Sequence, residues 1–208
     1  MTTRLHAIVD TELAVRAGWT PIDLARAFFD GGATLIQLRA KQLSSAAFLD
    51  LADAVVGLAH SYRAIVIIND RADIALISGA AGVHVGQDDL PPLGARRMLG
   101  TDAVIGLSTH TVAQVERGVV EPVSYVAVGP VFGTRSKDTG YIAVGLELVG
   151  TAARVAGDMP VVAIGGITLE NARSVIEEGA AAVAVISDLL LGNDPRGRTQ
   201  AFLHRLTS

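Results

Sequence analysis

The chain of 208 residues contains no cysteine. Its absence excludes disulfide bonds, thiolate catalysis and zinc sites with sulfur ligands. Aromatic residues are also scarce, at 4% of the chain, and we expect them to pack in the core and not to form a platform for stacking nucleic-acid bases.

Long runs of like charge and long hydrophobic runs are missing as well. The 17 basic and 21 acidic residues give a net charge of −4 without a run of five like charges, so we expect neither nucleic acid nor a membrane as partner. Asp188 interrupts the apolar stretch "AAAVAVISDLLLG", and the first residues lack the pattern of a signal peptide. These features predict a cytoplasmic protein that acts on small molecules.

Short β-branched runs alternate with helix-like segments along the whole chain. The eight runs are "RLHAIVD", "ATLIQLRA", "AIVIIND", "AGVHVGQ", "AVIGLST", "SYVAVGPVF", "MPVVAIGG" and "AAVAVISD". Apolar residues with a spacing near 3.6 lie between most of them, and nearly continuous apolar strands suit a parallel sheet buried on both faces. The pattern predicts a single α/β domain over residues 1–208, a (β/α)8 TIM barrel, with an open doubly wound sheet as the alternative.

Helix boundary signals accompany this alternation. Pro21 follows Thr20 at the expected start of the first long helix, and Thr168 is an expected N-cap for a helix that Gly179 ends.

In such a barrel the chemistry lies where the strands end, at the mouth formed by the βα loops. Gln37, Arg39 and Lys41 share one parity at the end of the second strand, so all three are expected to point into the mouth. The two cations either form structural ion pairs with nearby aspartates or bind an anion, and we favour the anion because buried cations are rare without such a role.

Asp70 and Asp89 end neighbouring strands and are expected to approach each other. Two carboxylates repel unless a proton or a cation lies between them, and Mg²⁺ takes one or two carboxylates together with substrate phosphates. A general acid/base pair and ordinary solvated loop carboxylates are the alternatives. Arg39, Lys41 and Lys137 nearby favour Mg²⁺ with a pyrophosphate.

The ends of the seventh and eighth strands indicate a second anion site. "AIGGIT" allows backbone amides to approach a ligand, "VISD" adds a hydroxyl and a further main-chain donor, and this pair of loops often binds a phosphate monoester in TIM barrels. A double glycine alone is also typical of a tight turn. His110 has either an acid/base or a structural role, and we favour the structural one, while His84 is expected inside the fourth strand.

Seven blocks resemble the thiamine phosphate synthase family, also called thiamine-phosphate pyrophosphorylases, in order and spacing. They are "QLRAK", "INDRADIAL", "GVHVGQDDLP", "IGLSTHT", "VGPVFGTRSK", "AIGGIT" and "VAVISDLL". The resemblance implies a barrel enzyme that joins 4-amino-2-methyl-5-(diphosphomethyl)pyrimidine to a thiazole phosphate, releasing pyrophosphate and forming thiamine phosphate.

The resemblance also implies which residues act. The residues implied for the pyrimidine diphosphate are Gln37, Arg39, Lys41, Asn69, Ser108 and Lys137, with Arg39, Ser108 and Lys137 in catalytic roles. The residues implied for the thiazole phosphate are Thr134, Arg135, Ser136, Gly166, Ile186 and Ser187. Asp70 and Asp89 would hold Mg²⁺.

The chain departs from the family pattern at Ala40, where an acidic residue is frequent, and at Gly133 and Ser136, where proline and threonine are frequent. A thiazole tautomerase, which shares the barrel and transfers a proton, is the nearest alternative, but it does not need the Mg²⁺ and diphosphate residues that this chain keeps. A non-catalytic phosphate-binding barrel is the third hypothesis. A homo-oligomer is a further expectation, although the sequence identifies no interface.

Overall fold

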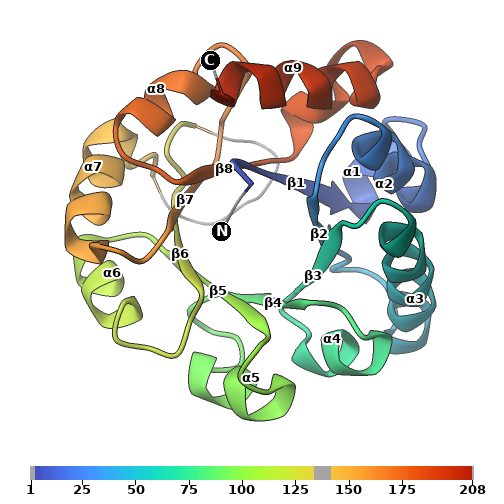
Figure 1. Ribbon diagram of the computed structural model, residues 1–208, viewed down its shortest axis with the longest axis horizontal. Coiled ribbons are helices and arrows are strands. Elements are labelled where there is room, and N and C mark those ends of the chain that lie inside the picture. The colour runs from blue at the N-terminus through green and yellow to red at the C-terminus, as the bar shows by residue number, and fades with distance from the viewer. Residues whose placement is uncertain (1–2, 134–141, 208) are drawn as a thin grey trace.

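The computed structural model describes residues 3–133 and 142–207, in which eight parallel strands close into a barrel surrounded by helices (Figure 1). Each strand pairs with the next along the chain, and β8 pairs with β1. The predicted (β/α)8 TIM barrel is therefore confirmed, and the open doubly wound sheet is excluded.

All eight predicted strands form within the runs that predicted them. They are β1 (Leu5–Asp10), β2 (Leu35–Arg39), β3 (Ile65–Asn69), β4 (Gly82–Val85), β5 (Val104–Thr109), β6 (Tyr125–Val128), β7 (Val161–Ile164) and β8 (Ala182–Val185). The helices around them are α1 (Thr11–Arg16), α2 (Pro21–Asp30), α3 (Ser45–Ser61), α4 (Ala72–Ser78), α5 (Pro92–Leu99), α6 (Val112–Gly118), α7 (Gly145–Ala156), α8 (Ala172–Glu177) and α9 (Pro195–Thr207), with a 3₁₀ segment, η1 (Ser187–Asn193), after β8.

The strands are apolar on both faces because each face packs against a different part of the core. Alternate residues of β1, β2 and β3, namely Ile8, Leu35 and Ile67, pack together inside the barrel. The residues between them, such as Ile36 and Ile68, pack in the layer that also holds the helices. This two-sided burial explains why the strand runs lack a polar alternation.

An aromatic side chain fills the middle of the barrel interior. Tyr125 on β6 is fully buried there, and its register partner on β5 is Gly106. A Cβ atom on Gly106 would lie 2.1 Å from the Tyr125 ring and 2.5 Å from Nδ1 of His84. Glycine at position 106 is therefore required by the space that Tyr125 and His84 occupy.

The two predicted helix starts had different outcomes. Thr20 caps α2 by accepting a hydrogen bond from the amide of Asp23, with Pro21 in the first turn, as predicted. The prediction of Thr168 as N-cap was wrong, because α8 begins only at Ala172. Asn171 accepts a hydrogen bond from the amide of Thr168 at 2.8 Å, and this contact holds residues 168–171 in a turn before the helix.

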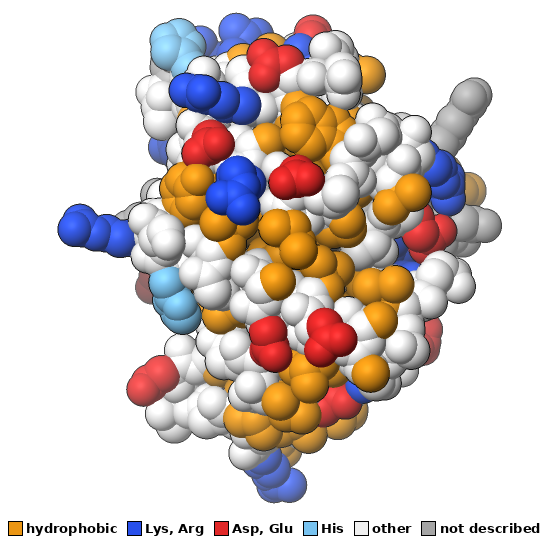
Figure 2. Space-filling model, turned by 90° about the vertical axis from the view of Figure 1, so that its right-hand side faces the viewer, with side chains coloured by type: hydrophobic (Ala, Val, Ile, Leu, Met, Phe, Trp, Pro, Cys, Tyr) orange, Lys and Arg blue, Asp and Glu red, His pale blue; other side chains and the backbone are white. Residues whose placement is uncertain are grey.

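The outer surface mixes residue types. Figure 2 shows the side on which α2 and α3 lie, where hydrophobic groups are interspersed with single acidic and basic groups and neither sign forms a continuous stripe. Within residues 3–133 and 142–207, every helix is too short or too polar to cross a membrane.

One buried histidine makes the stability of the barrel depend on pH. Burial lowers the pKa of His6 from 6.5 to about 4, and no hydrogen-bond partner for its Nε2 is found among the described residues. The native state therefore holds His6 neutral, whereas the unfolded chain takes up a proton below pH 6.5. Stability from this group is complete above pH 6.5 and is lost as the pH falls toward 4.

The free energy of unfolding falls when the pH is lowered from 7 to 5. We predict that this decrease is smaller in His6→Leu than in the wild type, by about 2 kcal/mol. Urea denaturation at the two pH values measures this loss. His60→Leu, at an exposed position on α3, is the control and should leave the loss unchanged. Equal acid sensitivity of the wild type and His6→Leu would contradict the assignment.

Candidate active site

An open pocket of about 720 Å³ lies among the carboxyl ends of the strands. Seven of the residues predicted for the site are in its wall: Gln37, Arg39, Asn69, Ser108, Gly166, Ile186 and Ser187. Apolar groups such as Ile8, Pro130 and Ile164 complete the lining. The barrel thus brings strand ends far apart in the sequence to one concave surface, as TIM barrels do.

Arg39 is held by an acid on the neighbouring strand. Its guanidinium forms an ion pair with Asp10, whose side chain is 4% exposed and also caps α1 by accepting from the amide of Leu13. The Nε atom of Arg39 is buried and has no acceptor among the described residues. An unpaired donor on a buried guanidinium is costly, so Arg39 has capacity for a further anion.

Lys41 and the two predicted metal ligands, Asp70 and Asp89, follow β2, β3 and β4 and are not among the residues that line this pocket. Lys41 forms an ion pair with Asp70, which directly follows β3 and has a positive φ of 64°. Aspartate tolerates this backbone conformation better than most residues. The amide of Asp70 donates to the carbonyl of His84 at 2.8 Å, which ties the end of β3 to β4.

The carboxyl groups of Asp70 and Asp89 are close enough to interact. Burial raises the pKa of Asp89, and interaction with Asp70 raises it further, whereas the amide of Gly86 and the charge of Lys41 act to lower it. The Gly86 amide donates to Asp89 Oδ2 at 2.8 Å. Two acids thus share one rim of the barrel, and their repulsion favours a cation between them.

Ser108 is the pocket end of a buried chain of hydrogen bonds. His84 Nε2 lies 2.8 Å from Ser108 Oγ, and His84 Nδ1 lies 2.9 Å from the hydroxyl of Tyr125. Burial raises the pKa of Tyr125, so its hydroxyl keeps its proton. The two ring nitrogens of His84 link this phenol to the hydroxyl of Ser108, and the chain of contacts orients the serine side chain at the pocket wall.

The loops after β7 and β8 form the opposite wall. Gly165 and Gly166 have positive φ angles of 97° and 64°, and a Cβ atom on either would lie less than 3 Å from the segment after β6. Both glycines are thus required by the backbone itself. Ile186 and Ser187, from the end of the neighbouring strand β8, line the same pocket.

His110 lies in the pocket wall with its ring tied to the backbone. Its Nδ1 is 2.5 Å from the carbonyl oxygen of Gly129, and its amide donates to Gln114. This geometry supports the structural role that we favoured from the sequence.

Part of the predicted site lies outside the described residues, namely Thr134, Arg135, Ser136 and Lys137. In the part of the chain that is described, no group of three or more histidine or acidic side chains gathers in a way that could hold a metal ion. Asp70 and Asp89 therefore stand as a pair, which is the number of carboxylates that Mg²⁺ commonly takes.

Sequence reasoning missed two residues that organise the site. Asp10 ends β1 as a carboxylate in "AIVD", and examination of the first strand end would have revealed it as a candidate partner for Arg39. Tyr125 gave no such signal, because a tyrosine at the start of an apolar strand is indistinguishable from a core residue until its neighbours are known.

Comparisons with known proteins agree on one family. Residues 5–189 match the family model described as thiamine monophosphate synthase. The chain is 43% identical over 203 residues to thiamine-phosphate synthase of Chlorobium phaeovibrioides, with 97% of this chain and 93% of the relative covered. It is 44% identical over 207 residues to that of Koribacter versatilis, with 99% and 96% covered.

Solved structures give the same result. A thiamine phosphate pyrophosphorylase from Pyrococcus furiosus superposes with a TM-score of 0.87 at 29% identity, covering 98% of this chain and 95% of that one. A 3-hexulose-6-phosphate synthase superposes with a TM-score of 0.71 at 18% identity, covering 98% of this chain and 100% of that one, a likeness that shows the fold alone.

We predict that Gly106→Ala destabilises the protein by about 1–3 kcal/mol, because the new methyl group overlaps Tyr125 and His84. Denaturant unfolding measures the change. Gly57→Ala is the matched control: it lies in α3 with open space around the added carbon, so it should be neutral or stabilising by up to about 1 kcal/mol. Equal stabilities of the two variants would contradict the tight packing at position 106.

Proposed function

The chain belongs to the thiamine monophosphate synthase family and is an enzyme that forms thiamine phosphate; on this premise, we propose its substrates, its metal and its mechanism. The substrates are 4-amino-2-methyl-5-(diphosphomethyl)pyrimidine and 4-methyl-5-(2-phosphoethyl)thiazole or its carboxylated form, and pyrophosphate is released. One observation carries the proposal: Arg39, whose buried Nε has no acceptor among the described residues, lines a pocket at the strand ends, and the interacting carboxylates of Asp70 and Asp89 follow β3 and β4 at the same end of the barrel.

The diphosphate of the pyrimidine substrate binds at the ends of β2, β3 and β5. Arg39, whose Nε has no acceptor among the described residues, binds a diphosphate oxygen, while its ion pair with Asp10 holds the guanidinium in place. Gln37 and Asn69 are buried polar groups in the same wall and bind the pyrimidine part, and Lys41 adds charge at the rim. Lys137, outside the described residues, contributes a further cation in this proposal.

The donor set fits Mg²⁺. Asp70 and Asp89 supply hard oxygen ligands, and the repulsion between them decreases when a divalent cation binds. Bound there, Mg²⁺ would neutralise charge on the diphosphate. Lys41 forms an ion pair with Asp70 and so places a positive charge beside this ligand.

The reaction proposed is dissociative. The aminopyrimidine donates electrons toward its methylene carbon, the C–O bond to diphosphate breaks, and the thiazole nitrogen attacks the resulting pyrimidine methyl cation. The protein has to hold the two substrates together and to stabilise the charge on the leaving group. Ser108, oriented by His84, donates a hydrogen bond to an oxygen of the departing diphosphate and keeps its proton.

The phosphate of the thiazole substrate binds between the loops after β7 and β8. The tight backbone at Gly166 and the main chain of Ile186 and Ser187 face one another there. Thr134, Arg135 and Ser136, outside the described residues, complete this subsite in the proposal. The site thus accepts two anions, one on each side of the barrel mouth.

This arrangement favours the synthase over the alternatives. A tautomerase has no use for Arg39 and the paired acids Asp70 and Asp89, all of which this chain keeps. A non-catalytic phosphate-binding barrel needs neither the paired acids nor an oriented serine. Mg²⁺ dependence, a cytoplasmic location, a homo-oligomeric state and the lack of a nucleic-acid partner remain predictions.

The direct test is to incubate the protein with both substrates and Mg²⁺ and to follow thiamine phosphate and pyrophosphate by chromatography. We expect stoichiometric formation of both products, with loss of the reaction when EDTA is added. Product formation that EDTA leaves unchanged would overturn the metal proposal. Failure to form either product would overturn the substrate proposal.

We predict that Asp89→Asn lowers kcat by about 10²-fold or more at saturating substrates, because it removes one of two charged metal ligands next to the leaving group. Steady-state kinetics as a function of Mg²⁺ concentration measure the effect. The adjacent Asp88 is exposed, so Asp88→Asn is the control and should retain wild-type kcat. Equal kcat for the two variants would remove Asp89 from the metal site.

We also predict that His110→Ala keeps kcat within about tenfold of the wild type, since its ring contacts the backbone of Gly129 and is given no proton-transfer role. The kcat of purified His110→Ala and its pH profile provide the measurement. A loss of about 10³-fold or more would indicate acid/base catalysis and support the tautomerase-like alternative.

A further inference from the structure

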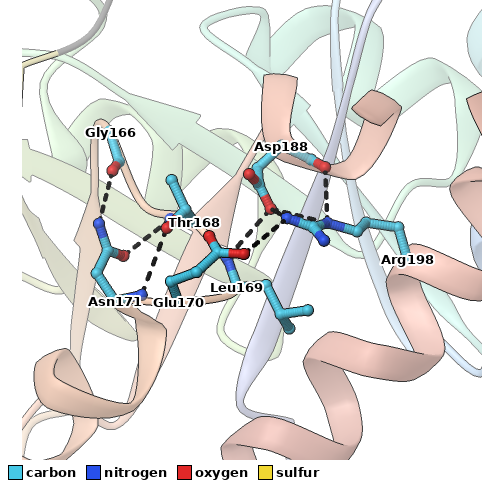
Figure 3. A network of polar contacts seen from close by, with 7 residues as sticks. All are labelled: Gly166, Thr168, Leu169, Glu170, Asn171, Asp188 and Arg198. Atoms are coloured by element: carbon cyan, nitrogen blue, oxygen red, sulfur yellow. Dashed lines mark hydrogen bonds and ion pairs between the residues drawn. The ribbon is translucent and has the colours of Figure 1, made fainter. Parts of the chain in front are cut away.

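A polar network joins the two loops assigned to the thiazole phosphate. Figure 3 shows it between the turn at residues 166–171, the start of η1 and helix α9. Asn171 donates to the carbonyl of Gly166 at 3.0 Å, which holds the first loop. The carboxylate of Asp188 and the guanidinium of Arg198 occupy the centre of the network, and the function proposed above does not use either of them.

Asp188 is a buried acid with several donors around one oxygen. Its Oδ2 accepts from the amide of Leu169 at 3.1 Å, and from Nε and Nη2 of Arg198 at 3.0 and 2.7 Å. Nε of Arg198 also reaches the main-chain carbonyl of Asp188 at 3.2 Å. The side chain of Asp188 is 5% exposed. One carboxylate thus links the β7 loop to helix α9 and fixes the backbone of its own residue.

The position of this acid matters because it directly follows Ser187. Ser187 and Ile186 line the pocket, and Asp188 lies behind them. An uncompensated negative charge at this depth would repel a phosphate in the adjacent pocket, since buried charges are poorly screened. Arg198 supplies the compensation. Glu170 also approaches Arg198, at 3.7 Å, but its side chain is 75% exposed and its influence is screened by solvent.

We propose that Asp188 and Arg198 form a charge-neutral clamp that positions the β7 and β8 loops around the phosphate of the thiazole substrate. The inference rests on the proposed function, because it assigns the clamp to the phosphate subsite of the same pocket. Neither residue touches the phosphate, so both are positioning residues. Asp188 gives the backbone its geometry, and Arg198 cancels the charge that this geometry introduces.

The proposal makes the two partners unequal. Arg198→Gln leaves the buried carboxylate uncompensated, and we expect the Kd for thiazole phosphate to rise by about tenfold or more. In Asp188→Asn the amide oxygen still accepts hydrogen bonds, and the positive charge of Arg198 is no longer compensated. Because a positive charge does not repel a phosphate, the Kd should stay within about threefold of the wild type. The double variant Asp188→Asn/Arg198→Gln should recover most of the affinity that Arg198→Gln loses.

Isothermal titration calorimetry of each variant with thiazole phosphate measures these values, and thermal unfolding checks that each is folded. The KM for the pyrimidine diphosphate should remain near its wild-type value in all of them. Arg173→Gln is the matched control, because Arg173 pairs with Glu177 on the exposed side of nearby α8. If Arg198→Gln fails to fold, Arg198→Lys keeps the charge and should bind thiazole phosphate within about threefold of the wild type.

An unchanged Kd in Arg198→Gln, or no recovery of affinity in the double variant, would overturn the clamp. So would a Kd for Arg198→Lys that rises by the tenfold or more expected for Arg198→Gln. A wild type that does not bind thiazole phosphate would overturn it as well. Binding of thiazole phosphate without formation of thiamine phosphate would instead overturn the proposed function and leave the clamp in place. If the wild type forms thiamine phosphate but all variants bind thiazole phosphate with equal affinity, the proposed function stands and the clamp is overturned.

Discussion

Charge balance at the mouth of the barrel is the constraint on which the site depends. Parallel strands bring all their carboxyl ends to one rim, and four of these ends carry buried or half-buried acids. Asp10 is matched by Arg39, Asp70 by Lys41, and Asp188 by Arg198. Asp89, the fourth, forms no ion pair with any described residue, and its pKa is raised by burial and by Asp70. The rim therefore has a local excess of negative charge at one place, which is where a divalent cation is proposed.

In each of the three pairs a carboxylate anchors a long cationic side chain. Arg39 is anchored by Asp10, and its Nε has no acceptor among the described residues. Arg198 holds the carboxylate and the carbonyl of Asp188 together. Anchoring a long cationic side chain removes rotamer entropy before a ligand arrives, so less is lost on binding. Rigid strands and paired charges thus hold these side chains in place before any ligand binds.

Much of this arrangement was predictable because strand runs and strand ends are local features. The eight apolar runs predicted eight strands, and the polar residues after them, such as Gln37 and Ser108, lie in the pocket wall. Contacts between distant segments were not predictable in the same way. The pairing of Arg39 with Asp10 needs the β1–β2 register. The N-cap was predicted wrongly at Thr168 because reciprocal hydrogen bonds between Thr168 and Asn171 close a turn before α8 begins.

The lack of a side chain at Gly106 limits which amino-acid replacements the barrel interior can accommodate. His84, Gly106 and Tyr125 are register neighbours on three consecutive strands, and they fill one volume together. Enlarging position 106 requires a smaller residue at position 125, and that exchange would also remove the phenol that orients the imidazole behind Ser108. The three positions therefore form a coupled unit, in which single replacements are costly and accommodation requires simultaneous changes.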